Sequence, residues 1–290
     1  MQTTCRTDLA MEAREQNGEI SGVEMEQEQY ASAVLTRVRV INEAGAQRLR
    51  KPIGTYITIE QRDLYEKEPK DAQALGRCIA GQLTKLLGAA AAEGCALVVG
   101  LGNRDLTPDS LGPRVVSEIM VTRHLYEVMP DSRDVHLRPV CAIAPGVMGE
   151  TGIETGEIVR AVAAVVKPSC VIIVDALAAR STQRILSTVQ ITDTGVVPGS
   201  GVGNHRAALT KETLGVPVIA VGVPMVVHAS TILRDAMERI TGSDTPMEAL
   251  LHSMDCENLV VTPVMIDEAV RSVAGHVAQA INAALQSGLS

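Results

Sequence analysis

The sequence of 290 residues contains no Phe, no Trp and only four Tyr. Proteins that bind single-stranded nucleic acid stack its bases on aromatic side chains, so this composition argues against that class. Positive charge is also scarce, because 26 basic residues stand against 34 acidic ones and the net charge is −8. A protein that binds a phosphate backbone needs the opposite balance, and we expect no direct nucleic-acid partner. The core must be aliphatic, with 11 Met available to fill gaps.

Targeting signals are also missing. The N-terminus has no apolar segment of the kind found in signal peptides, and no stretch approaches the ~18 uninterrupted apolar residues of a membrane span. We therefore expect a cytoplasmic protein without a membrane partner. The six Cys show no Cys-x-x-Cys spacing, which favours free thiols over a disulfide framework.

Short apolar runs alternate with helical patterns from residue 96 onward. Wholly apolar runs of this length are typical of parallel strands covered on both faces. The pattern predicts an α/β fold with three layers, a mostly parallel twisted sheet and helices on both faces. Strands are expected at 96–99, 139–143, 171–174, 216–221 and 259–261, and helices at 113–128, 156–166, 225–240 and 264–285.

The N-terminal third is less regular. Residues 1–30 are polar and acidic with little periodicity, and we interpret them as a solvated arm. Alternating apolar residues predict a strand at 34–40, and further elements are expected as a helix at 44–50, a strand at 56–59 and a helix at 71–92.

Two carboxylates follow predicted strands. Asp109 lies in the loop after 96–99, and Asp175 directly follows 171–174. Ligands of open α/β sheets bind beyond the carboxyl ends of the strands, so both belong to one crevice if their strands are neighbours. Such a pair either shares a proton and activates water or binds a metal, and the spacing alone does not choose between these chemistries. The structural alternatives are helix capping by Asp109 and backbone amide binding by Asp175.

Glycine-rich loops offer a different class of function. The segment 198–206 is dense in glycine and suits an anion, so a nucleotide- or anion-binding protein is a competing hypothesis. His205 within it is a candidate metal ligand, and His228 is a weaker candidate near a predicted helix start. Gly100 and Gly102 do not continue into a dinucleotide fingerprint, and no Gly-x-Ser-x-Gly elbow or His-Glu-x-x-His motif indicates another catalytic centre.

Several long motifs resemble the germination proteases of endospore-forming bacteria. They cover most of the chain between Arg6 and Leu285, and they are the segments 100–113, 122–125, 145–155, 175–180 and 198–204. Members of this family are endopeptidases that initiate the degradation of small acid-soluble, DNA-binding spore proteins during spore germination.

The resemblance implies a hydrogenase-maturation-peptidase-like fold, a homotetramer and a location in the spore core. It also implies that Asp109 and Asp175 are the catalytic carboxylates, because each lies inside a matching motif. The mechanism then needs no cofactor. In the alternative, a divalent metal is bound by Asp109, Asp175 and His205, as in hydrogenase maturation peptidases.

The resemblance further implies synthesis as a zymogen. Thr7-Asp-Leu-Ala-Met-Glu12 is similar to the family's cleavage segment, and we expect autoprocessing between Asp8 and Leu9. Residues 1–8 would then be a propeptide and residues 9–290 a single peptidase domain, with 9–30 as its polar arm. Two departures stand out: the region between Ile240 and Leu259 is shorter than in longer members, and His228 replaces an expected Asp.

Overall fold

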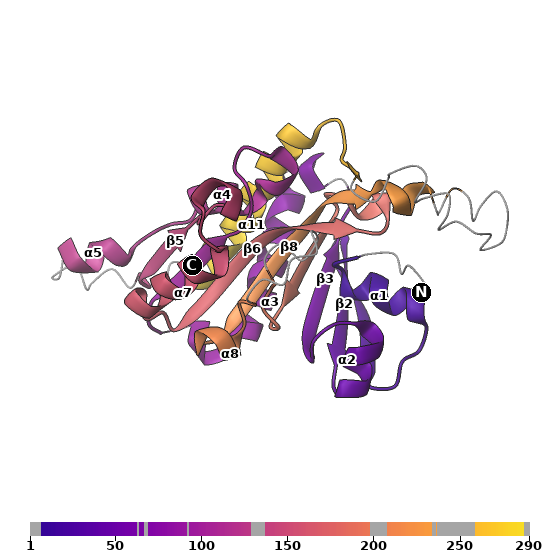
Figure 1. Ribbon diagram of the computed structural model, residues 1–290, viewed down its shortest axis with the longest axis horizontal. Coiled ribbons are helices and arrows are strands. Elements are labelled where there is room, and N and C mark those ends of the chain that lie inside the picture. The colour runs from indigo at the N-terminus through magenta and orange to yellow at the C-terminus, as the bar shows by residue number, and fades with distance from the viewer. Residues whose placement is uncertain are drawn as a thin grey trace.

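The computed structural model describes residues 7–62, 64–66, 69–91, 93–128, 137–197, 208–233, 236 and 259–286. These residues form a nine-stranded sheet that lies between two layers of helices (Figure 1). The order of the strands along the sheet is β1-β2-β3-β7-β8-β6-β4-β5, and β9 also pairs with β8. The strands are β1 Val23–Tyr30, β2 Ala33–Val40, β3 Gly54–Glu60, β4 Ala96–Gly100, β5 Val140–Ile143, β6 Cys170–Ala179, β7 Thr188–Thr192, β8 Val218–His228 and β9 Val260–Val261.

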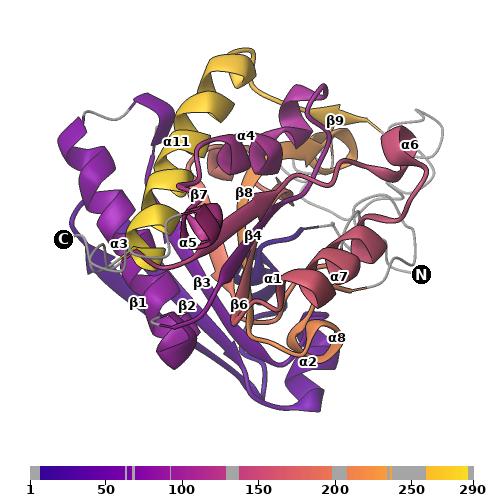
Figure 2. The ribbon, with the colours of Figure 1, turned by 90° about the vertical axis from the view of Figure 1, so that its left-hand side faces the viewer.

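The helices lie on both faces of the sheet, as Figure 2 shows. One face is covered by α3, α4 and α11, and the other carries α1, α2, α7 and α8. Their bounds are α1 Ala10–Asn17, α2 Glu43–Leu49, α3 Pro69–Leu87, α4 Leu111–Ser117, α7 Thr155–Val166, α8 Lys211–Leu214 and α11 Ile266–Leu285, and the shorter α5 and α6 span Arg123–Val128 and Met148–Thr151.

Periodicity explains the strongest elements. In α11 the residues Val270, Val273, Val277 and Ile281 recur every three or four positions, and all are buried against the sheet and α3. The predicted strands at 96–99, 139–143 and 171–174 form the parallel neighbours β4, β5 and β6. The predicted α/β architecture with helices on both faces is thereby confirmed.

The sheet contains more antiparallel pairing than the sequence pattern predicts. Parallel pairing joins β8, β6, β4 and β5. Antiparallel pairing joins β1, β2, β3, β7 and β8 in succession, and β9 is also antiparallel to β8. Neither β1 nor β7 was expected from the sequence, because β1 is exposed along nearly its whole length and β7 is buried and rich in polar residues.

The interpretation of residues 9–30 as a solvated arm is wrong. Residues 10–17 form α1 and residues 23–30 form β1. Leu9 and the first turn of α1 are buried with Val38, Val40 and Tyr56, which line the face of β2 and β3 opposite α3. The five consecutive buried residues Leu9–Ala13 cover little more than one helical turn. A segment this short gives no recognisable hydrophobic period in the sequence.

Two predicted helices are also corrected. Residues 218–228 form one long strand, and the predicted helix 225–240 begins only at Ala229, with residues 229–233 helical. The predicted helix 113–128 is two short helices, α4 and α5, separated by residues 118–122. An apolar run such as Val218–Val227 is compatible with a buried strand or a buried helix, and periodicity does not separate them.

No helix among the described residues is long and apolar enough to cross a membrane. Cys78, Cys95, Cys141 and Cys170 are free thiols, in agreement with the prediction for these four.

The contribution of α11 to stability can be measured by truncating a buried side chain. Ile281 is fully buried, so Ile281→Ala should lower the free energy of unfolding by about 2–5 kcal/mol in urea titrations. Val165 on α7 is 79% exposed, and Val165→Ala should change it by less than ~0.5 kcal/mol. Equal effects of the two substitutions would contradict the packing described for α11.

Candidate active site

The loop after β4 is shaped by glycines that permit close backbone contacts. A Cβ atom at Gly102, where φ is +111°, would lie 2.0 Å from the carbonyl oxygen of Asp109. A Cβ atom at Gly100 would lie 2.1 Å from the carbonyl oxygen of Gly112, at the start of α4. These glycines therefore bring the loop back against its own strand, and that packing accounts for the Gly-x-Gly spacing.

Asp109 ends the short 3₁₀ turn Thr107–Asp109 in this loop. Its carboxylate accepts a hydrogen bond from the Asn103 amide at 2.8 Å, and no side chain caps α4. The capping interpretation is therefore wrong. Burial raises the pKa of Asp109, the Asn103 amide opposes this shift, and the charge of Glu150 adds to it.

Asp175 lies inside β6, because the strand continues to Ala179. The neighbouring β4 ends at Gly100, which pairs with Val174, so Asp175 lies just beyond the end of that strand. Its carboxylate accepts a hydrogen bond from the Ala176 amide at 2.9 Å. Burial raises the pKa of Asp175 to about 8, with the charges of Asp109 and Asp8 adding to the shift.

The fold thus brings Asp109 and Asp175 together. Their elements β4 and β6 are parallel neighbours, and the Leu101 amide after β4 donates to the Val174 carbonyl at 2.8 Å. Burial and the charge of Asp109 disfavour ionisation of Asp175, so Asp175 keeps its proton at pH values where an ordinary carboxyl group is ionised. Such a pair can supply a general base and a general acid.

The segment predicted to be cleaved lies beside this pair. The Asp8 amide donates to the Ala178 carbonyl at 3.0 Å, and the Ala178 amide donates to the Asp8 carboxylate at 2.8 Å. Ala178 is three residues beyond Asp175 on the same strand. Leu9, on the other side of the predicted cleavage site, is fully buried.

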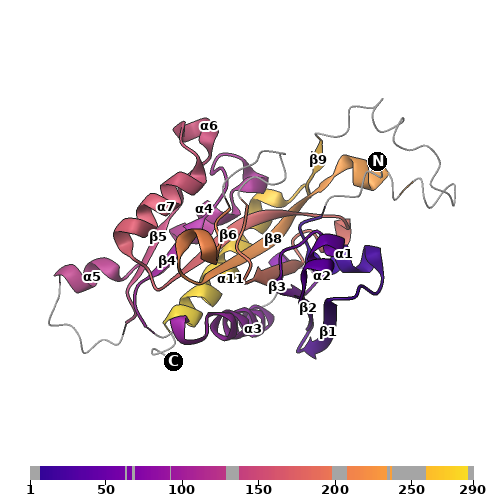
Figure 3. The ribbon, with the colours of Figure 1, turned by 60° about the horizontal axis from the view of Figure 1, so that its bottom comes forward.

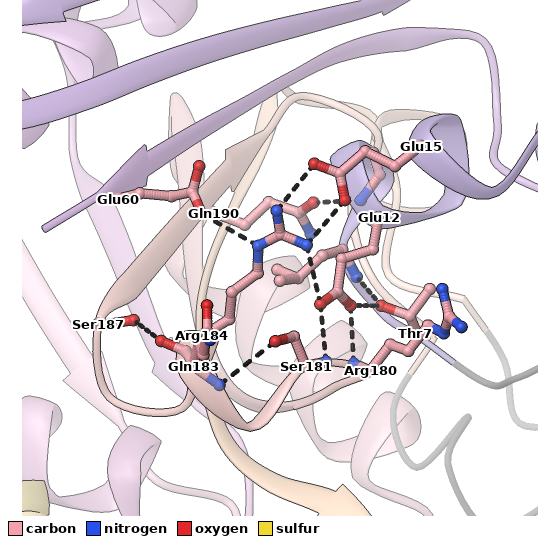
Figure 4. Close-up of polar contacts among 12 residues, drawn as sticks. Thr7, Glu12, Glu15, Glu60, Arg180, Ser181, Gln183, Arg184, Ser187 and Gln190 are labelled. Carbon is pink, nitrogen blue, oxygen red and sulfur yellow. Dashed lines mark hydrogen bonds and ion pairs between the residues drawn. The ribbon is translucent and has the colours of Figure 1, made fainter. Parts of the chain in front are cut away.

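A buried carboxylate holds this segment in place. Glu12 is 1% exposed and accepts hydrogen bonds from the amides of Arg180 at 2.7 Å and Ser181 at 3.0 Å, directly after β6. It also pairs with the Arg184 guanidinium at 3.1 Å and accepts a hydrogen bond from the Thr7 hydroxyl. Figure 4 shows these contacts together with those of Arg184 to Glu15 and Glu60.

Sequence reasoning missed Glu12, Arg184, Lys51 and Gln190, which all contact the N-terminal segment or its anchor. In the sequence Glu12 is one of several acidic residues in the polar segment 1–30, and nothing local distinguishes it from the others. A buried first turn is visible in the sequence only as Leu9-Ala10-Met11, which is too short to predict a helix.

Two predicted features lie outside the described residues, namely the loop 198–206 with His205 and most of the region 240–259. His228 is the last residue of β8, where it pairs with Val260, and helical residues begin directly after it at Ala229. Among the described residues no group of three His, Cys, Asp or Glu side chains is arranged to bind a metal. Asp109 and Asp175 alone are two oxygen ligands, so the metal-dependent alternative depends on His205.

Comparison with known proteins shows the family. The sequence profile described as germination protease matches residues 3–243. A germination protease of Clostridium perfringens (strain SM101 / Type A) is 44% identical, and the match covers 98% of this chain and 96% of that protein. The germination protease of Clostridium acetobutylicum is 43% identical, and the match again covers 98% of this chain and 96% of that protein. The germination protease of Bacillus thuringiensis subsp. konkukian is 44% identical over 81% of this chain and 66% of that protein.

The α/β fold with its acidic pair is compatible with a peptidase, and the sequence similarity establishes one. The chain belongs to the germination protease family. Among solved structures, a [NiFe] hydrogenase maturation protease HycI from Thermococcus kodakarensis KOD1 is similar over 69% of this chain and 98% of that one, at 17% identity. The TM-score is 0.36.

The anchoring role of Glu12 can be compared with that of Glu15, because both pair with Arg184. Glu12→Gln should lower the free energy of unfolding by roughly 2–4 kcal/mol, since an amide has one oxygen for two backbone donors. Glu15 is 48% exposed, and Glu15→Gln should cost less than about 1 kcal/mol. Urea unfolding measures both, and a larger cost at Glu15 would contradict the assignment of Glu12 as the anchor.

The raised pKa of Asp175 has a consequence for stability. The folded chain retains this proton up to about pH 8, whereas the unfolded chain releases it near the ordinary value of 3.8. Stability therefore falls as pH rises between these values. Relative to the wild type, Asp175→Asn should gain on the order of 2–4 kcal/mol between pH 4 and pH 8. Urea midpoints of uncleaved protein at pH 4, 6 and 8 test this expectation, and a constant difference would refute it.

Proposed function

We propose that this peptidase is a spore endopeptidase that initiates degradation of small acid-soluble spore proteins during germination, with Asp109 and Asp175 activating the attacking water. Family membership supports the reaction class. The observation that carries the mechanism is the convergence of two carboxyl groups with unequal surroundings, one of which has a pKa raised to about 8.

The two carboxyl groups divide the chemistry. Both carboxylates accept one amide hydrogen bond, but the pKa of Asp175 is raised to about 8, so Asp109 acts as the base that removes a proton from water. The water oxygen attacks the peptide carbonyl carbon, and Asp175 in its protonated form donates its proton to the leaving nitrogen. The carbon–nitrogen bond breaks, and the products are a carboxylic acid and an amine. This division requires Asp175 to be protonated, and activity should fall as pH rises through about 8.

We also propose that the protein is made as a zymogen and cleaves itself between Asp8 and Leu9, which leaves residues 9–290 as a single peptidase domain. The position of Asp8, hydrogen-bonded to Ala178 on the strand that carries Asp175, supports this proposal. A homotetrameric assembly and a location in the spore core belong to the same proposal. Light scattering on the purified protein tests the assembly.

Mass spectrometry of the full chain mixed with a small acid-soluble spore protein tests the activity. The wild type should lose residues 1–8 and cleave the substrate after acidic residues. Asp109→Asn and Asp175→Asn should each slow both reactions by about 10²–10⁴-fold. Asp105 lies exposed in the same loop, and Asp105→Asn serves as the matched control with unchanged rates.

Each reaction is run with and without a chelator. Unchanged rates agree with the acidic pair acting alone. Loss of activity that a divalent metal restores would favour the alternative in which Asp109, Asp175 and His205 bind a metal. Appreciable cleavage by Asp175→Asn would overturn the proposed roles, and absence of cleavage by folded wild-type protein would overturn the proposed activity.

A further inference from the structure

The carbonyl oxygen of Asp8 has two side-chain partners. Lys51 Nζ donates to it at 3.0 Å, and Gln190 Nε2 donates to it at 3.1 Å. Lys51 also reaches the neighbouring carbonyl oxygen of Thr7 at 3.4 Å. Lys51 follows α2 and Gln190 lies in β7, so two distant parts of the chain converge on one peptide carbonyl.

This carbonyl belongs to the bond whose cleavage we propose. We infer that Lys51 and Gln190 form an oxyanion hole for self-cleavage between Asp8 and Leu9. The inference rests on the proposed function, because it assigns roles at the bond that the proposed reaction breaks.

The surrounding contacts fix the carbonyl between its donors. Gln190 donates to it through Nε2 and accepts a hydrogen bond from the Ala10 amide at 2.8 Å through Oε1, so one side chain spans the predicted cleavage site. On the other side, Ala178 binds both the amide and the carboxylate of Asp8. The Leu9 amide donates to Thr7 Oγ1 at 3.1 Å. A peptide bond held on both sides is already oriented for reaction.

The sheet places one of the two donors, Gln190, on the same face as Asp175. Gln190 pairs with Gly222, and Gly222 pairs with Asp175, so the side chains of Gln190 and Asp175 lie on the same face two strands apart. That separation is about 10 Å between Cα atoms. The side chain of Leu177 lies over Gly222 between them, because a Cβ atom at Gly222 would come within 2.5 Å of it. Asp8 is near enough for its charge to raise the pKa of Asp175.

The chemistry of the donors suits a developing negative charge. When water attacks, the carbonyl oxygen becomes an oxyanion until the bond to nitrogen breaks, and donors already in place stabilise it without reorganisation. Burial lowers the pKa of Lys51, while the charges of Asp8 and Glu12 oppose this shift. An ammonium in such surroundings interacts with an oxyanion more strongly than it would in water.

Single-turnover self-cleavage of the full chain tests the inference. Lys51→Met removes one donor, and Gln190→Glu removes the other while it keeps the oxygen that accepts from Ala10. Each should slow the appearance of the Leu9 terminus by roughly 10²-fold. Lys85 and Gln183 are exposed, and Lys85→Met and Gln183→Glu are the matched controls with wild-type rates. Urea midpoints identify any variant that fails to fold. If one of the two donor variants does not fold, the cleavage rate of the other tests the inference.

A docking role is separated from oxyanion stabilisation by amide hydrogen exchange at Asp8 and Ala178. The exchange is measured in an Asp109→Asn background, so that the chain stays uncleaved. Slow cleavage with unchanged protection supports the inference, and slow cleavage with lost protection overturns it. Cleavage by both donor variants at the wild-type rate or faster also overturns it, with the proposed function intact. A wild-type chain that never cleaves between Asp8 and Leu9 overturns both.

Discussion

The contacts of the N-terminal segment depend on one buried carboxylate. Glu12 neutralises part of the charge of Arg184 and accepts hydrogen bonds from the two amides that follow β6. Because Glu12 lies at the start of α1, the same bonds fix the chain immediately before it. Asp8 can then pair with Ala178 and present its carbonyl to Lys51. Figure 3 shows α1 and α2 side by side near β3.

The acidic pair depends on a different constraint, the parallel pairing of β4 and β6. The last residue of β4, Gly100, pairs with Val174, so β4 ends one residue before the level of Asp175. The following loop can therefore fold back and place Asp109 near Asp175. Gly102 and Gly112 make that return tight enough for a backbone amide to bind one carboxylate. Each carboxylate accepts one backbone amide, so the difference comes from burial and from the charges of Asp109 and Asp8, which raise the pKa of Asp175 to about 8.

Much of this arrangement could be predicted from the sequence, where periodicity or chain order carries the information. The apolar period of α11 and the buried runs of β4 and β6 are strong local signals, and the rule that ligands gather at the carboxyl ends of parallel strands led directly to Asp109 and Asp175. The strand identity of 225–228 could not be predicted, because an apolar run is compatible with both periods. Lys51 and Gln190 have no local signal at all, since their role arises from contact with residues 43 and 182 positions away.

That separation along the chain also determines the order in which the molecule assembles. Arg180, Ser181 and Arg184, which bind Glu12, lie 168 to 172 residues further along the chain. During synthesis the N-terminal segment therefore emerges from the ribosome long before these partners exist. Contacts between such distant residues form late, because closing a loop of this size costs chain entropy that only the assembled sheet can offset. The bond between Asp8 and Leu9 therefore reaches its position beside the two carboxylates only in a chain that has nearly finished folding.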